Sequence, residues 1–549
     1  MNLDAVFVES GDEKGTLASA HGNSSFEARG SYNTLDFVVR LRPDLHRILE
    51  EQGGEVSMRE CDSWDAAQAF STYLHETIHW WLHVGTSAGL MLSFLQPAHA
   101  HMNRKWLDDV LTTHGPVKPL LGLAEKLNKV ERPDRALNVV INNWHDLDFF
   151  RQLVINPTGL VKSVAEHPYF ESVGHSYRMA IGAASWLIGA TIDPNYEALP
   201  HPRDWEADMA TLRESKVEGF YFRSPIGIPP LGMLEILEGQ ARLSQIQYLY
   251  GASGGRLSWD DFRRRGMLSS VYVRAFETFL KLAGVEWPST VDDPIVGLFL
   301  LICDVALSPS EGLFLPMTDP SALIWSTDPG WRFTFLCRIA KEEGEEFKRS
   351  IKKYSADEYW EVSERLSQRL LSPSPRQLAE AISRYAETHP AWIKLVEEDD
   401  AFEYQEGNFP IRVLLGRFTR VQRDKLKTPQ FFCWPGMCLT SFRQALDSET
   451  VKILFSEHQA LFLDRADRDV YPRLVPNRDE KVLQHLFDQF YVWVSMYEMT
   501  RQWLVEDGPF EYDYGWLTSK FSNAEIKSWA DNNFKVGMSV HPDVFAVLR

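Results

Sequence analysis

Cysteine is scarce in this chain, with 5 among 549 residues. An odd number of scattered cysteines does not form a disulfide framework and is typical of a reducing compartment. Cys433 and Cys438 have four residues between them and no second cysteine pair to complete a zinc site, so we expect ordinary thiols there. The full set is Cys61, Cys303, Cys337, Cys433 and Cys438.

Long apolar runs are missing as well. The longest, residues 295–307, contains Asp304 and is shorter than the roughly 20 residues that a membrane span needs. The N-terminal residues have neither the basic nor the apolar stretch of a secretory signal. These absences predict a soluble, cytoplasmic protein without a membrane partner.

Positive charge is in deficit, because 57 Lys and Arg against 76 Asp and Glu give a net charge of −19. A chain of this charge repels nucleic-acid phosphates, so we expect no general nucleic-acid binding. The basic run at residues 263–265 is predicted to be the solvated end of a helix. The chain also lacks a P-loop, a G-x-G-x-x-G dinucleotide motif and a G-x-S-x-G nucleophile elbow.

Helical spacing of apolar residues is abundant, whereas alternating patterns are few. The predicted fold class is therefore mainly α with small β additions. Strands are predicted at residues 33–42, 430–433 and 451–463, and the acidic run 397–400 is expected to form a surface turn or extension. Helices are predicted at about 136–153, 176–190, 231–250, 270–284, 294–307, 331–343, 356–371, 375–388 and 482–505.

Three regions are predicted along the chain. Residues 1–54 form an N-terminal segment with one strand and a flexible part at 9–31, which is rich in Gly, Ser, Glu and Ala. Residues 55–310 form a helical catalytic domain, and residues 311–549 form a C-terminal, mostly helical domain. The proline-containing stretch 308–330 is the expected linker.

The most informative motif is His75-Glu76-Thr77-Ile78-His79, an H-E-x-x-H pattern. Its helix is predicted to begin at Asp62 or Ser63, either of which can cap it, and to end near Gly85. Residues four apart share a helical face, so both imidazoles can bind one metal ion. Glu76 then stands beside the metal as a general base.

This segment resembles the active-site helix of the zincin metallopeptidases. The resemblance implies that His75 and His79 bind one zinc ion per chain, that Glu76 is catalytic, and that a third ligand follows later. Leu82 and Gly85 exclude the metzincin pattern, which has Gly and His at these positions. His83 is a minor alternative ligand, but we expect it to pair with a polar neighbour. Asp108 or Asp109 is another alternative, although two adjacent acidic residues on a helix are more often part of its solvated face.

The expected third ligand is Glu238, because Glu238-Gly239-Gln240-Ala241 is similar to the E-G-x-A stretch of aminopeptidase-type gluzincins. Glu235, on the same predicted helix, is an alternative ligand. Arg242, four residues after Glu238, is predicted to pair with it and orient it. Gly239 would permit close helix approach.

The function expected from this resemblance is that of an intracellular zinc-dependent peptidase acting on a specific protein or peptide substrate. Tyr248 and Tyr250, on the same predicted helix, could serve as oxyanion donors, but we expect packing roles for both. Two alternatives stay open: a non-catalytic helical interaction protein whose H-E-x-x-H is structural, and a metal-dependent hydrolase of small-molecule amides or esters. The pattern carries no information on oligomeric state.

Overall fold

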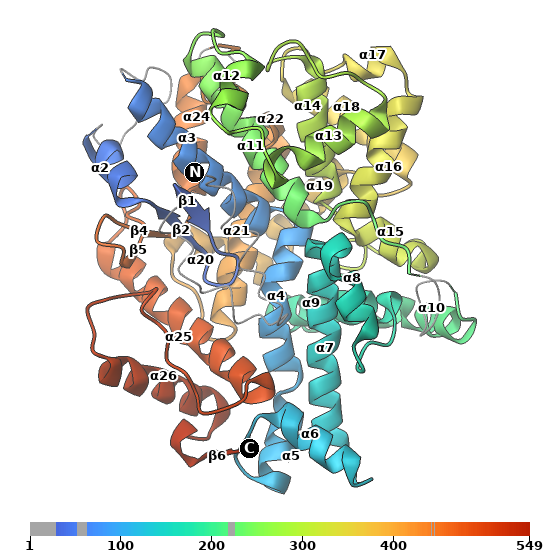
Figure 1. Ribbon diagram of the computed structural model, residues 1–549, viewed down its shortest axis with the longest axis vertical. Coiled ribbons are helices and arrows are strands. Elements are labelled where there is room, and N and C mark those ends of the chain that lie inside the picture. The colour runs from blue at the N-terminus through green and yellow to red at the C-terminus, as the bar shows by residue number, and fades with distance from the viewer. Residues whose placement is uncertain (1–28, 52–62, 218–225, 441, 444, 549) are drawn as a thin grey trace.

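The computed structural model describes residues 29–51, 63–217, 226–440, 442–443 and 445–548. Within these residues the fold is mainly helical with two small sheets, which confirms the predicted fold class (Figure 1). Asp62 and most of the predicted flexible segment 9–31 lie outside the described residues.

Every predicted helix is present, with ends within a few residues of those expected. The helices before residue 310 are α2 Pro43–Glu51, α3 Trp64–Gly85, α4 Ser87–Met102, α5 Arg104–His114, α6 Leu120–Lys129, α7 Arg135–Ile155, α8 Pro157–Glu166, α9 Val173–Ile192, α10 Arg203–Glu214, α11 Met233–Ala252, α12 Trp259–Arg264, α13 Val271–Ala283 and α14 Pro294–Ala306. Those after it are α15 Leu323–Thr327, α16 Pro329–Glu342, α17 Glu345–Lys348, α18 Ala356–Leu370, α19 Pro375–Thr388, α20 Pro390–Ala401, α21 Phe409–Lys427, α22 Pro429–Cys433, α23 Pro435–Cys438, α24 Ser448–His458, α25 Glu480–Val505 and α26 Asn523–Met538.

The boundaries of α3 follow from its capping residues. Ser63 is the N-cap, and its hydroxyl accepts a hydrogen bond from the Ala66 N–H at 3.1 Å. The helix ends at Gly85, and Thr86 then caps the next helix, α4, by accepting from the Gly89 N–H at 3.1 Å. α3 is therefore a fixed element, continuous from Trp64 to Gly85.

The larger sheet joins segments from both ends of the chain. Its order is β1 (Gly30–Tyr32), β2 (Val38–Leu41), β4 (Phe462–Asp464) and β5 (Val470–Pro472). β1 runs antiparallel to β2, with Gly30 opposite Leu41, and β2 runs parallel to β4. β1 is thus the edge strand, and it lies against α3. A second sheet pairs β3 (Val117–Lys118) with β6 (Ala546–Val547).

Two of the strand predictions are wrong. Residues 430–433 lie in α22, where Pro429 occupies the first helical position that proline favours. Residues 451–458 belong to α24, so only the end of the predicted strand 451–463 is extended, in β4. Short apolar runs of this kind fit a buried helix as well as a strand.

The hydrophobic core crosses the predicted domain limits. One buried cluster contains residues from Tyr32 to Leu517. α21 packs on α3 and α4, where the Gln422 amide donates to the Gly85 carbonyl at 2.8 Å. The expected linker 308–330 contains α15, and its Phe314 stacks on Phe418 of α21 with ring centroids 4.8 Å apart. The three-region division stays a prediction.

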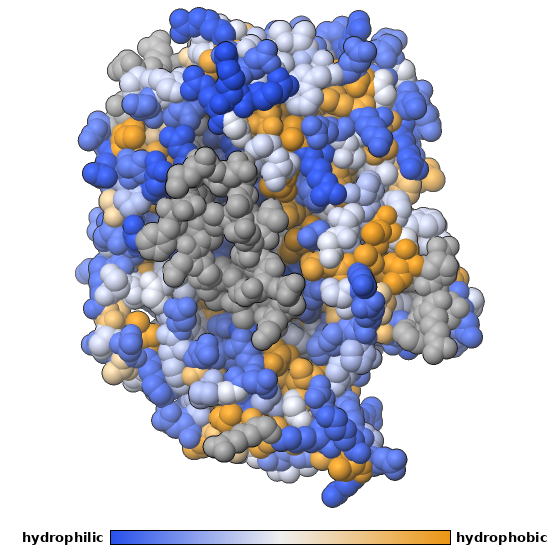
Figure 2. Space-filling view, viewed as in Figure 1, coloured by the Kyte–Doolittle hydropathy of each residue, from blue (hydrophilic) through white to orange (hydrophobic). Residues whose placement is uncertain are grey.

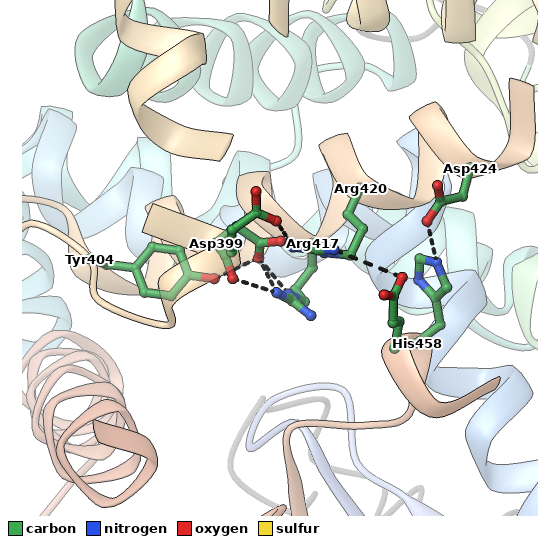
Figure 3. A network of polar contacts seen from close by, with 8 residues as sticks. Asp399, Tyr404, Arg417, Arg420, Asp424 and His458 are labelled. Carbon is green, nitrogen blue, oxygen red and sulfur yellow. Dashed lines mark hydrogen bonds and ion pairs between the residues drawn. The ribbon is translucent and has the colours of Figure 1, made fainter. Parts of the chain in front are cut away.

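The acidic run 397–400 is not a surface turn, so this prediction is wrong. It lies within α20, and Glu398 and Asp399 are buried. Arg412 binds Glu398 through two hydrogen bonds of 2.7 and 2.9 Å, while Arg417 and Arg420 bind Asp399 (Figure 3). Buried carboxylates require such partners; α21 supplies the three arginines, and the Tyr404 hydroxyl also donates to Asp399 at 2.6 Å.

The sequence also predicts that the chain has no membrane-spanning helix and no disulfide framework. Across the described residues, no helix combines the length and the apolar character needed to cross a bilayer. Hydrophilic residues cover much of the described surface in Figure 2, with apolar residues gathered mainly toward its right side. The four described cysteines are buried and form no disulfide with one another, and burial raises the pKa of Cys433 well above its usual value.

Candidate metal centre

α3 and α11 lie side by side and bring the predicted ligands together (Figure 1). The Nε2 atoms of His75 and His79 are 3.1 Å apart. The Glu238 Oε2 atom lies 3.3 Å from the first and 3.4 Å from the second. All three candidate ligand atoms fall within 4.8 Å of one another. Residues from two helices, far apart in the sequence, therefore present three donors to one point.

The donor atoms in this cluster are incompletely satisfied within the protein. Glu238 Oε2 is buried and has no hydrogen bond of good geometry among the described residues. Two imidazole nitrogens 3.1 Å apart share at most one proton, so a lone pair points into the cluster. Two imidazoles and one carboxylate are a donor set that zinc takes in proteins. The residues present therefore fit a divalent cation.

The charges of the cluster are arranged for a cation. Burial disfavours the Glu238 carboxylate, but the neighbouring His79 and His75 outweigh burial and hold its pKa well below the usual range. Burial lowers the pKa of His75 to about 4, which keeps its imidazole neutral at pH 7. An ionised Glu238 and a neutral His75 are the protonation states that metal binding requires. Against the effect of burial, Glu238 raises the pKa of His79, so this imidazole competes for a proton with the metal.

Glu76 stands next to these ligands and faces the backbone of β1. Burial raises its pKa to about 8, against the opposing charge of His79. A Cβ atom at Gly30 would lie 2.9 Å from both Cγ and Oε1 of Glu76, and 3.0 Å from the Thr72 methyl. Only glycine therefore fits in the strand at this position without displacing the Glu76 carboxylate.

Glu235, the alternative ligand, is directed elsewhere. Its Oε2 accepts from the Gly232 N–H at 2.9 Å, in the first turn of α11. Its Oε1 lies 3.2 Å from Nη1 of Arg274 on α13. The structure thus gives Glu235 a capping role and does not bring it to the cluster.

The predicted pairing of Arg242 with Glu238 is wrong. Arg242 Nη1 donates to Gln245 Oε1 at 2.8 Å, and the guanidinium lies 3.9 Å from the centre of the Tyr272 ring. Glu238 instead turns toward the two histidines of α3. Spacing along one helix could not reveal that a neighbouring helix competes for the carboxylate.

Tyr272 is a residue that sequence reasoning missed. It belongs to α13, and its ring lies edge-on to that of His75 with centroids 6.0 Å apart. No motif surrounds it, so only the packing of α13 on α11 indicates its place. Tyr248 and Tyr250 pack against Phe70 and Phe442, as expected from packing roles.

The minor alternative ligands lie outside the cluster. His83 is buried between the Tyr32 hydroxyl at 2.7 Å and the Ser93 hydroxyl at 3.0 Å, which confirms the expected polar partner. Asp108 pairs with Arg104 on the exposed surface of α5, and Asp109 is exposed beside it.

Two other clusters of acidic residues with a histidine could in principle hold a metal ion: Asp424, Glu457 and His458, and Asp531, His541 and Asp543. Both already have basic side chains as partners. His458 binds Asp424 at 2.9 Å in the network of Figure 3, and Arg420 Nη1 lies 3.9 Å from Glu457, the third member of this group. Asp531 and Asp543 share Lys527, at 2.5 and 2.8 Å. In both groups an arginine or lysine already pairs with a carboxylate. In the cluster of His75, His79 and Glu238, by contrast, no arginine or lysine of the described residues forms an ion pair with the carboxylate.

Comparison of the chain with protein-family models, with curated proteins and with solved structures finds no match in any of the three. Functional inference therefore depends on the geometry of the residues themselves.

Proposed function

We propose that the protein is a zinc-dependent peptidase that hydrolyses peptide bonds in a protein or peptide substrate. One observation carries the proposal: His75, His79 and Glu238 present three ligand atoms to one point, with Glu76 adjacent. Three protein ligands leave one position of a tetrahedral ion for a reactant, as in catalytic sites, whereas structural sites use four. The zincin resemblance of the α3 motif points to the same chemistry.

Zinc, when bound by these three residues, would supply a Lewis acid and lower the pKa of a water molecule toward about 7. The protein's own contribution is a proton shuttle. Glu76 accepts the proton from the attacking water and then donates it to the leaving amine. Its placement on the helix that carries both histidines fixes it beside the reacting centre.

The strand β1 supports an extended peptide as the substrate. Among the described strands β1 pairs only with β2, so its other edge is not used within the sheet. Unpaired strand edges bind extended peptides through backbone hydrogen bonds. Because Gly30 of β1 lies against Glu76, a peptide on this edge would pass the general base.

The test compares the wild-type protein with Glu76→Gln, both loaded with zinc. Each is incubated with a proteome-derived peptide mixture, and new termini are identified by mass spectrometry. We expect cleavage by the wild type and at least a 100-fold loss in the variant, with zinc content unchanged.

Other outcomes would contradict the proposal. Equal cleavage by both proteins would place the activity in a contaminant or another site. An absence of peptide cleavage, with turnover of small esters or amides, would favour a small-molecule hydrolase. An absence of any turnover would favour a non-catalytic protein.

A further inference from the structure

Arg242 is a half-buried cation with no anionic partner among the described residues. Its hydrogen bond goes to the neutral amide of Gln245 at 2.8 Å, and its guanidinium stacks on Tyr272 at 3.9 Å. Its Nε atom is buried and has no acceptor. A guanidinium has five N–H donors, and among the described residues the hydrogen bond to Gln245 uses one of those of Arg242.

The surroundings of Arg242 hold it beside the metal ligands. Gln245 donates to the Ser71 hydroxyl of α3 at 3.1 Å, one helical turn before His75. Tyr272, on the other side of the guanidinium, contacts the His75 ring. Arg242 is also close enough to influence the charge of His75, Glu76 and His79. The cation is therefore fixed at the catalytic cluster by two neutral groups.

Charge balance shows why Arg242 is not needed as a counter-ion once a metal is bound. Two neutral imidazoles, one carboxylate and a divalent cation sum to one positive charge, which Glu76 cancels only when it is ionised. Arg242 then adds a positive charge for which the site has no compensating anion. A partly desolvated cation of this kind is stabilised when an anion reaches it.

We propose that Arg242 binds a carboxylate of the substrate, so that the site selects acidic peptides. This inference rests on the proposed peptidase function. The carboxylate belongs either to an Asp or Glu side chain near the scissile bond or to the C-terminus of the peptide. Arg242 is a specificity residue in this account, because Glu76 and the metal ligands carry out the chemistry.

The test measures binding in the absence of turnover. Zinc-loaded Glu76→Gln protein is immobilised and incubated with random heptapeptides that are N-acetylated, in one pool with free C-termini and in another with C-terminal amides. Retained peptides are identified by mass spectrometry. We expect at least a fivefold enrichment of Asp and Glu in the amidated pool for a side-chain carboxylate. Enrichment of the free-acid pool over the amidated pool would instead identify the C-terminal carboxylate.

Matched variants assign the preference to Arg242. Adding Arg242→Gln should abolish the enrichment while zinc content stays unchanged. Arg256→Gln removes an exposed charge from the loop just after the same helix and should leave the enrichment intact. Tyr272→Leu keeps the charge but removes the ring beneath it, and should reduce the enrichment; it serves as the second variant where Arg242→Gln does not fold.

The outcomes separate this inference from the proposed function. Retention of neutral and acidic peptides alike, or enrichment that survives both Arg242→Gln and Tyr272→Leu, would overturn the carboxylate site. Cleavage of peptides by the wild type without acidic preference would overturn this inference alone. Selective binding of acidic peptides without any cleavage by the wild type would support the carboxylate site and contradict the peptidase.

Discussion

Glu235 and Glu238 are three residues apart on α11, and both are buried, yet they have different roles. Glu235 satisfies the Gly232 N–H and faces Arg274, so its charge is compensated within the protein. Glu238 faces two histidines and keeps one oxygen without a hydrogen bond. At the scale of single residues, partner identity distinguishes a structural carboxylate from a ligand more clearly than burial does.

This difference predicts opposite effects for two alanine substitutions. Glu238→Ala removes the anionic ligand and should weaken zinc binding by at least about 100-fold, since even residues behind a ligand contribute 10–100-fold. Glu235→Ala removes a cap and should lower the free energy of unfolding by about 1 kcal/mol. Zinc titration and urea unfolding of both variants test this, and zinc loss confined to Glu235→Ala would refute the ligand assignment.

At the scale of elements, the site depends on three segments that meet: α3, α11 and β1. Gly239 of α11 permits the close approach that the sequence suggested, since a Cβ there would lie 3.1 Å from that of Ala275 on α13 and 3.3 Å from the Phe299 ring. Gly30 likewise permits the close approach of β1 to α3. Gly30 therefore determines how closely β1 approaches Glu76, whereas Gly239 determines how closely α11 approaches α13 and α14.

The role of β1 predicts a loss of turnover without loss of metal. Gly30→Val places a Cβ atom 2.9 Å from Cγ and Oε1 of Glu76, so this side chain, the proposed general base, must move. Turnover should fall at least tenfold, with zinc content unchanged. Ser31→Val is the matched control, because adjacent strand residues point to opposite faces. Equal activity of Gly30→Val and wild type would exclude a tight fit between β1 and Glu76.

The helices could be predicted from the sequence because apolar spacing and caps such as Ser63 are local signals. The sheet could be predicted only in part, since β2 pairs with β4 across more than four hundred residues of chain. The candidate metal ligands could be predicted from the H-E-x-x-H motif and from the stretch at Glu238. Tyr272, which stacks on Arg242, and Arg417, which pairs with Asp399, come from neighbouring helices. The local sequence therefore gives no signal of either contact.

At the scale of the whole molecule, several histidines are buried as neutral rings away from the cluster. Burial lowers the pKa of His83 to about 3, of His99 to about 4 and of His145 to about 3. The unfolded chain binds a proton at each of these residues below about pH 6.5, whereas the folded protein does not. Their contribution to stability is therefore complete above that pH and is lost as the pH falls.

This linkage predicts acid sensitivity that one substitution should reduce. When the pH falls from 7.5 to 5.5, each such histidine should lower the free energy of unfolding by about 1.4 kcal/mol. His83→Gln should remove about that much of the pH dependence, whatever its effect on stability at pH 7.5. Urea unfolding at the two pH values measures the difference. An unchanged pH dependence would mean that His83 is protonated in the folded protein.

The central claim is that His75, His79 and Glu238 hold one zinc ion, and metal content tests it most directly. The purified protein would be equilibrated with zinc, dialysed and measured by elemental mass spectrometry, beside a variant with alanine at all three positions. We expect about one zinc per chain in the wild type and none in the variant. No retained zinc in the wild type, or the same amount in both proteins, would contradict it.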